Sequence, residues 1–190
     1  MTLEALEETL GSLPEGLDQC YERILLNINP KYFPLTIKAL NWLAVSRRPL
    51  SIAELAEATS IAPELPQSQR ILVRRQLSDP RDILLLCSSL IHISKRNRKH
   101  ADEYQWGEDK VENVVVEEVE LAHFSVKEYL LSSLTQTLPG IPKALTEQSC
   151  HRYVAEGCLA YLLQYDKADS LKHYRYEMFP LATYAARYWC

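Results

Sequence analysis

The spacing of apolar residues limits the possible folds most strongly, because it is helical along most of the chain and strand-like in only two places. Apolar residues recur every three or four positions in the helical stretches, which is the period of one helix face. Residues 91–94 alternate and residues 114–124 are valine-rich without a breaker, as in β-strands. The sequence therefore predicts a mainly α fold with a small β-hairpin (α+β). The predicted helices cover residues 3–10, 17–28, 34–46, 53–59, 79–90, 125–134, 149–165 and 181–190.

Local signals indicate where two of these helices begin. Ser51 and Glu54 form an S-x-x-E capping box, in which the two side chains satisfy each other's free backbone N–H groups. Ser125 and Glu128 form a second box directly after the valine-rich strand. The helix over 34–46 is expected to bury Ile37, Leu40, Leu43 and Ala44, with Trp42 at its flank.

The order of the elements indicates a winged helix within a longer helical chain. Three helices are followed by two strands that a long polar loop from Lys95 to Lys110 joins, which is the order of a winged helix. We assign residues 31–135 to this winged-helix domain, residues 1–30 to the end of a preceding helical domain, and residues 136–190 to a C-terminal helical region. The last helical stripe is still periodic at residue 190 without a stop signal, so we expect the chain to be cut from a longer one.

The charges of the chain are segregated along the sequence. The net charge is only −4, but residues 70–99 hold eight basic and two acidic residues, whereas residues 102–120 hold eight acidic residues and one lysine. The basic cluster at 95–99 falls at the predicted wing tip, where it can contact DNA phosphates with Arg70, Arg74 and Arg75. The alternative is a solvated hairpin loop whose two halves attract each other. The leucine-rich third helix also suits burial better than a DNA groove, so nucleic acid is the less favoured partner.

Several kinds of chemistry have no signature in the sequence. The chain lacks phosphate-binding and dinucleotide-binding glycine motifs, a lipase-type serine motif and regular metal-ligand spacings. We therefore predict that the chain is not an enzyme and holds no metal or cofactor of its own. Its five cysteines are scattered and never form a C-x-x-C pair, which favours free thiols in a reducing compartment. The absence of a membrane-length apolar run and the acidic N-terminus predict a soluble cytoplasmic protein without membrane contact.

His123 is the residue for which the sequence suggests a function. If the valine-rich strand continues to residue 124, alternation places His123 on the same side as Leu121, which predicts an inward ring beside a helix N-terminus. One interpretation is a core histidine that bonds a backbone carbonyl, and the other is a donor to an anion that a neighbouring domain supplies. Ser125 is interpreted as a helix cap rather than a nucleophile. His92 lies opposite the isoleucines of its strand, so we expect it in solvent.

Five motifs resemble, in the same order, a segment of fungal NACHT–ankyrin proteins. LAHFSVKEYLL at residues 121–131 closely resembles the LAHFSVKEYL stretch of that family. The other motifs are LPEGLD with CYERIL at 13–25, ALNWLA with RPLSIAELAEA at 39–58, CLAYLL at 158–163 and YAARYW at 184–189. The match covers nearly the whole chain. The segment is also known as the GPI inositol-deacylase winged helix domain, but the missing lipase serine motif means that no deacylase chemistry is implied.

The resemblance implies a module between a nucleotide-binding NACHT domain and C-terminal ankyrin repeats, which would be its intramolecular partners. Such proteins are STAND-type switches, similar to NOD-like receptors, that act in fungal non-self recognition and cell death. In that class a winged-helix histidine in an H-x-[ST]-x-x-E-[YF] setting contacts bound ADP and holds the closed state. His123, Ser125, Glu128 and Tyr129 match that setting, but Phe124 replaces the aspartate of the plant version, so only the histidine role carries over. The resemblance thus implies ADP or ATP for the parent protein, with His123 sensing the ADP phosphate only beside a NACHT domain.

Overall fold

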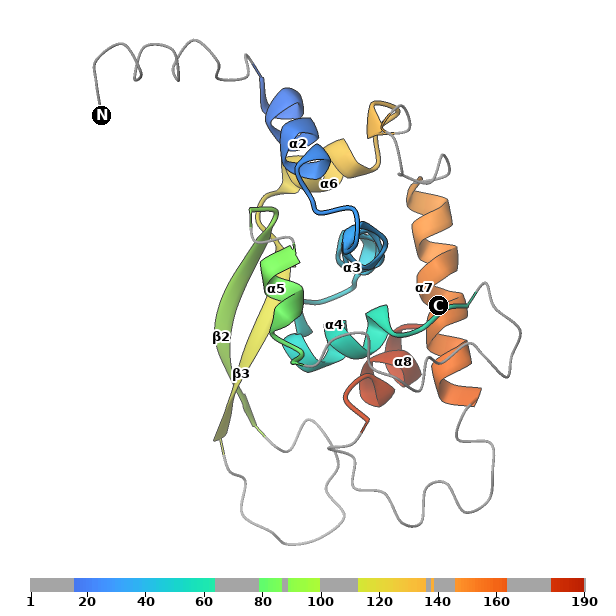
Figure 1. Ribbon diagram of the computed structural model, residues 1–190. Coiled ribbons are helices and arrows are strands. Elements are labelled where there is room, and N and C mark those ends of the chain that lie inside the picture. Colours follow the sequence, from blue (N-terminus) through green and yellow to red (C-terminus); the bar gives the residue numbers. More distant parts are fainter. Residues whose placement is uncertain are drawn as a thin grey trace, which may run out of the picture.

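The computed structural model describes residues 16–63, 79–86, 89–99, 113–135, 138, 146–163 and 179–189 (Figure 1). The helix predicted over 3–10 lies outside these residues. The described elements are α2 (Leu17–Leu26), α3 (Phe33–Val45), β1 (Leu50–Ser51), α4 (Ile52–Thr59), α5 (Asp82–Leu86), β2 (Ile91–Lys99), β3 (Asn113–Leu121), α6 (Phe124–Leu130), α7 (Glu147–Leu163) and α8 (Ala182–Tyr188). The predicted mainly α fold with a small sheet is confirmed.

The sheet has three antiparallel strands in the order β1-β3-β2. β2 pairs with β3 along its whole length, from Ile91 opposite Leu121 to Lys99 opposite Asn113. β1 adds two residues on the other side of β3, with Leu50 opposite Val119. No sequence pattern predicts this short strand. From α3 to β3 the described elements follow in the order α3, β1, α4, α5, β2, β3.

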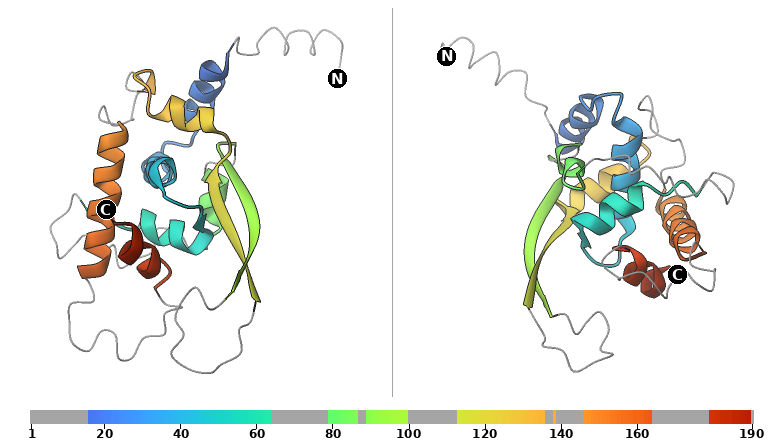
Figure 2. Two further views of the ribbon diagram at one scale, coloured as in Figure 1. Left: turned by 180° about the vertical axis from the view of Figure 1, so that it is seen from behind. Right: turned by 60° about the horizontal axis from the view of Figure 1, so that its bottom comes forward.

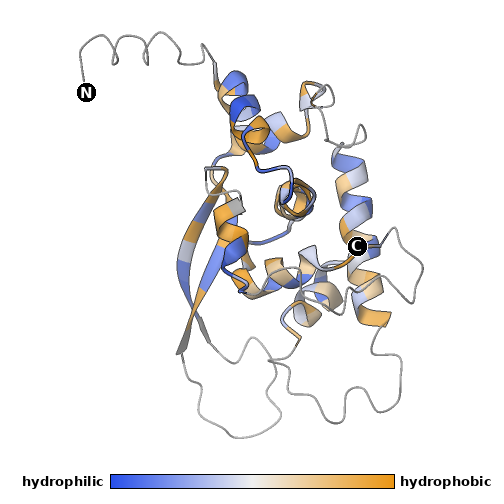
Figure 3. Ribbon diagram, viewed as in Figure 1, coloured by the Kyte–Doolittle hydropathy of each residue, from blue (hydrophilic) through white to orange (hydrophobic). Residues whose placement is uncertain are grey.

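Helix α3 lies at the centre of the fold. α7 packs on one side of it, whereas α5 and β3 lie on the other side, as two opposite views show (Figures 1 and 2). Nine of its thirteen residues are buried, and its ribbon is accordingly hydrophobic almost all round (Figure 3). A helix that is apolar on every face belongs in a core rather than on a surface. The prediction that Trp42 flanks this helix is therefore wrong, because Trp42 is 0% exposed.

The apolar core is continuous across the three segments that we assigned from the sequence. It includes Leu25 of α2, Leu40 of α3, Val119 of β3, Cys158 of α7 and Tyr184 of α8. The boundaries near residues 30 and 135 stay predictions, but both flanking segments contribute side chains to the same core.

The C-terminal helices are fitted closely against α3. A side-chain Cβ at Gly157 of α7 would lie 2.9 Å from Cζ2 of Trp42, so only glycine lets α7 approach this far. Tyr184 of α8 meets the same indole edge-on, with the ring centroids 6.2 Å apart. α8 in turn packs on α7. None of the described helices is long and apolar enough to cross a membrane.

Two predicted boundaries around the hairpin are wrong. The helix predicted over 79–90 is described only as Asp82–Leu86, and a turn at 89–90 leads into β2. The polar loop predicted to begin at Lys95 does not begin there, because β2 runs to Lys99. The cause is the partner strand, since the valines of β3 pair with the polar residues of β2 in a continuous ladder. The basic cluster at 95–99 therefore lies in a strand and not in a wing-tip loop.

Candidate anion-binding site

His123 lies on the junction between β3 and α6, with its side chain exposed. The prediction of an inward ring is wrong, because β3 ends at Leu121 and the alternation of strand faces does not extend to residue 123. The Ala122 N–H instead donates to the carbonyl of Leu90, in the turn before β2, at 2.9 Å. His123 follows with extended backbone angles, φ −155° and ψ 154°, as the residue that caps α6.

The capping box predicted at Ser125 and Glu128 is also wrong. α6 begins at Phe124, so Ser125 lies inside its first turn. The free N–H of Ser125 donates to Nδ1 of His123 at 3.2 Å, so the imidazole fills the place that a serine or aspartate oxygen usually takes. Nδ1 can accept this bond only when it carries no proton, which in a neutral ring places the proton on Nε2.

A chain of hydrogen bonds leads from His123 back to the N-terminal helix. Nδ1 of His123 and Oγ of Ser125 are 2.7 Å apart. Oγ of Ser125 and the hydroxyl of Tyr21, on α2, are also 2.7 Å apart. Because Nδ1 is an acceptor, the Ser125 hydroxyl donates to it and accepts from the Tyr21 hydroxyl. Among the described residues no group bonds Nε2 of His123, so its N–H is available to a ligand.

Tyr21 is held in place by its own ring as well as by its hydroxyl. The ring lies 5.5 Å from that of Tyr129 on α6, at an interplanar angle of 48°. Burial, and then the carboxylates of Glu22 and Asp18, raise the pKa of Tyr129, so this phenol stays neutral. In the sequence Tyr21 stands out only as part of the CYERIL motif. No local pattern connects it with a residue 104 positions away.

His123 borders an open cleft of about 310 Å³. Its walls come from the turn after α3, the end of β3 and the start of α6. The charged residues in these walls are Arg47, Arg48, Lys127 and Glu120. The cleft is at the small end of the range for ligand sites and fits a phosphate or diphosphate group better than a whole nucleotide.

Lys127 is the cation best placed to act with His123. It lies one helical turn further along α6, so the two side chains share a side of the helix. Its Nζ is 3.5 Å from a carboxylate oxygen of Glu147, and about a third of the side chain (34%) is exposed. A partly exposed ion pair of this kind is weak and leaves the ammonium able to turn toward an anion.

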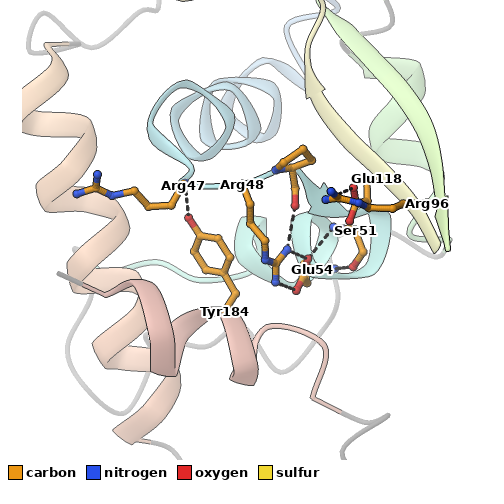
Figure 4. Close-up of polar contacts among 8 residues, drawn as sticks. Arg47, Arg48, Ser51, Glu54, Arg96, Glu118 and Tyr184 are labelled. Atoms are coloured by element: carbon orange, nitrogen blue, oxygen red, sulfur yellow. Dashed lines mark hydrogen bonds and ion pairs between the residues drawn. The ribbon is translucent and has the colours of Figure 1, made fainter. Parts of the chain in front are cut away.

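Arg48 borders the same cleft, but its guanidinium is already bound by other groups of the protein. Its guanidinium donates to the two carboxylate oxygens of Glu54 at 2.6 and 2.8 Å and to the Pro49 carbonyl at 2.9 Å (Figure 4). The rings of Tyr184 and Tyr188 lie 5.1 and 5.9 Å from it. Burial opposes its charge, but the hydrogen bond and charge of Glu54 outweigh burial and raise the pKa of Arg48. Figure 4 shows the side chain of Arg47 pointing away from this pair.

A serine and a histidine in contact can also form a nucleophile and its base. We therefore compare the hydrogen bonds of Ser125 and His123 with those that such a catalytic pair requires. Here Oγ of Ser125 already accepts from Tyr21, and Nδ1 of His123 also accepts a backbone N–H. Among the described residues nothing orients the ring from Nε2. The arrangement therefore suits a fixed hydrogen-bond donor better than proton transfer from serine, and the absence of catalysis stays a prediction.

Two of the described cysteines, Cys150 and Cys158, are buried thiols of low reactivity. Cys20, Cys150 and Cys158 are free thiols, whereas Cys87 and Cys190 lie outside the described residues. Burial raises the pKa of Cys150 to about 11 and that of Cys158 to about 12, so both stay protonated at neutral pH. Within the described ranges no group of three His, Cys, Asp or Glu side chains could hold a metal ion.

Basic residues on β2 and just before α5 lie close to carboxylates of β3. Nη1 of Arg96 is 3.8 Å from Glu118, and Nη2 of Arg81 is 2.8 Å from Glu117. Lys95 lies directly opposite Glu117 in the sheet. This supports the interpretation in which the two halves of the hairpin attract each other. Arg70, Arg74 and Arg75, and the side chains of Arg98 and Lys99, lie outside the described part of the chain. His92 is exposed as predicted.

One known protein resembles this chain over almost its whole length. Azaphilone pigments biosynthesis cluster protein L of Monascus ruber is 32% identical over 185 residues, which is 97% of this chain. The same stretch is 36% of the Monascus protein, so the chain spans about a third of the length of the relative that it matches. No family model matches the chain. No solved structure matches it either.

Proposed function

We propose that this chain is a non-enzymatic regulatory module of a cytoplasmic NACHT–ankyrin protein of the STAND type. In this proposal His123 detects a phosphate of ADP that an adjacent NACHT domain holds, and the module passes that state on to downstream ankyrin repeats. The observation that carries the proposal is the outward N–H of His123, which the bonds of Nδ1 fix in place at the edge of an open cleft.

The exposure of His123 supports this role better than the inward ring predicted from the sequence. A ring buried in the core would be saturated by its own protein, whereas an exposed and oriented donor can bond a group on a docked domain. If the bond exists only in the closed state, it shifts the equilibrium toward that state by the free energy of the bond. For a charge-assisted hydrogen bond this is about 1.5–3 kcal/mol.

The size of the cleft indicates that the module does not hold the nucleotide alone. About 310 Å³ accommodates the diphosphate end, with Lys127 beside it, and leaves the nucleoside to the neighbouring domain. The similarity to a stretch that forms 36% of a longer protein is compatible with a module of a larger chain. The ion pairs of Arg81 and Arg96 with Glu117 and Glu118 of β3 weigh against the alternative of a winged-helix nucleic-acid binder.

The test is the rate of ADP release from a parent protein that contains the NACHT domain. Replacing His123→Ala removes the donor, so we expect release to become about tenfold to a hundredfold faster and basal activity to rise. Stopped-flow fluorescence with a labelled ADP measures this rate. His92→Ala is the matched control, because His92 is equally a surface histidine but lies on β2. An unchanged release rate in His123→Ala would contradict the proposal.

A further inference from the structure

The hydrogen bonds behind His123 join two helices that are far apart in the sequence. The Tyr21 hydroxyl on α2 donates to Ser125 on α6, and Ser125 donates to Nδ1 of His123, with 2.7 Å between the heavy atoms of each bond. Figure 1 shows α2 lying across α6, and the same arrangement is visible from behind in Figure 2. The exposed ring that borders the cleft is therefore connected to the position of α2 through a single serine.

The hydroxyl of Tyr21 decides what Ser125 does. A serine hydroxyl has one proton and two lone pairs and rotates freely unless its partners fix it. The Tyr21 hydroxyl occupies a lone pair of Oγ, so the serine proton points to Nδ1. Without Tyr21 the serine hydroxyl can turn away, and Nδ1 keeps only the longer bond of 3.2 Å from the Ser125 N–H. The ring is then less restricted to the form that carries its proton on Nε2.

α2 is attached to the rest of the molecule by few buried groups. Of its ten residues only Leu25 is buried, and Leu17 and Leu26 are 60% and 51% exposed. Elements with little buried apolar surface open or shift at a lower free-energy cost than the core does. A shift of α2 that keeps Leu25 in the core would therefore be enough to break the bond between Tyr21 and Ser125.

We propose that Tyr21 is a positioning residue through which the placement of α2 controls the donor that His123 offers to an anion. When α2 is docked, the ring is held with Nε2–H outward, and when α2 moves away, the ring loses that preference. The coupling is reciprocal, so an anion at Nε2 also stabilises the docking of α2. The inference rests on the proposed function only in naming a phosphate group as the ligand.

The first experiment observes the ring itself, without a ligand. Nitrogen-15 NMR of the 190-residue chain, labelled at its five histidines and recorded at about pH 8, distinguishes the protonated from the unprotonated ring nitrogen. A His123→Asn spectrum assigns the signals of His123. We expect one well-defined Nε2–H form in the native chain, a clear shift toward a mixture of both forms in Ser125→Ala, and a smaller shift in the same direction in Tyr21→Phe.

The variants separate positioning from simple structural damage. Tyr21→Phe keeps the ring that packs on Tyr129 and removes only the hydroxyl. Ser125→Thr keeps a hydroxyl at the relay position and should restore the native ring form. Tyr153→Phe is the matched control, because it also removes a hydrogen-bonded hydroxyl, here one that donates to the Ile61 carbonyl at 3.4 Å. If Tyr21→Phe and Ser125→Ala both leave the His123 signals unchanged, the inference is wrong.

The second experiment adds inorganic pyrophosphate and follows the same His123 signals. We expect Tyr21→Phe and Ser125→Ala to weaken binding by about two- to tenfold, the effect of losing one neutral hydrogen bond. Ser125→Thr and Tyr153→Phe should bind as the native chain does. If the native chain shows no response to pyrophosphate, the proposed anion site fails while the first experiment still decides the role of Tyr21. Equal affinities in all variants would overturn the coupling and leave the anion site standing.

Discussion

The first turns of α4 and α6 are capped by different kinds of side chain. Each helix has free N–H groups in its first turn that need acceptors. At α4 the Ser51 Oγ accepts from the Glu54 N–H at 3.1 Å, and the Glu54 carboxylate accepts from the Ser51 N–H at 2.7 Å. At α6 the acceptor is Nδ1 of His123. Both helix ends are capped, but they differ in whether the capping side chain still has an unused hydrogen-bond donor.

At α4 the capping groups keep nothing available for a ligand. Glu54 is 2% exposed, and Arg48 binds both of its carboxylate oxygens (Figure 4). At α6 the capping ring is exposed and still has one N–H with no described partner. A closed polar cluster therefore stabilises the fold, whereas a cap with one unused donor can bind a group outside the molecule. Four predictions, in order of decreasing effect, test this contrast.

Replacing Glu54→Ala should destabilise the protein most. It leaves the guanidinium of Arg48 half-buried without its carboxylate and also removes half of the capping box, so we expect a loss of about 3–5 kcal/mol in the free energy of unfolding. Urea denaturation followed by circular dichroism measures this. Glu156→Ala is the control, because Glu156 pairs with Arg152 at 2.8 Å on the surface of α7 and should contribute less than about 1 kcal/mol. Equal losses of stability in the two variants would show that the cluster at α4 contributes no more than an exposed ion pair.

Gly157→Ala tests the packing that holds the C-terminal helices beside this cluster. The added methyl group would lie 2.9 Å from Cζ2 of Trp42, an indole that is itself fully buried and touched by Tyr184. We expect a loss of about 1–3 kcal/mol by overpacking, measured by the same urea titration. Gly16→Ala is the comparison, since no atom lies within 4 Å of a Cβ there. A Gly157→Ala protein as stable as Gly16→Ala would mean that α7 can move away from α3 freely.

Replacing His123 separates capping from recognition. His123→Asn keeps a good capping side chain, so its stability should stay within about 0.5 kcal/mol of the native protein, whereas His123→Ala should lose about 0.5–2 kcal/mol. Both variants lack the imidazole Nε2–H and should lose the pyrophosphate response; the amide nitrogen of the asparagine, with Oδ1 as the cap, takes the place of Cδ2 and not of Nε2. Thermal unfolding and a titration by isothermal calorimetry measure the two properties. Binding that survives in His123→Asn would show that the outward donor is not what recognises the anion.

The same contrast explains which parts the sequence could predict. The capping box at Ser51 is a local pattern four residues long, and the structure contains it. The orientation of His123 was mispredicted because alternation was extended two residues beyond the end of β3. The bond between Tyr21 and Ser125 joins residues 104 positions apart, and no local periodicity encodes such a contact. No local pattern indicates that Arg48 binds the carboxylate of Glu54 and so completes the buried box.

The smallest effect is expected for the exposed ion pair between Arg81, just before α5, and Glu117 of β3. The Arg81 side chain is 67% exposed and pairs with Glu117, whose side chain is 27% exposed. Replacing Arg81→Gln should therefore cost about 0.2–1 kcal/mol, because water screens exposed ion pairs, and raising the salt concentration should reduce this difference further. Urea titrations at low and high salt measure it. A loss as large as that of Glu54→Ala, unaffected by salt, would show that exposure does not separate stabilising polar clusters from the others in this protein, and the contrast between the two helix caps would lose its physical basis.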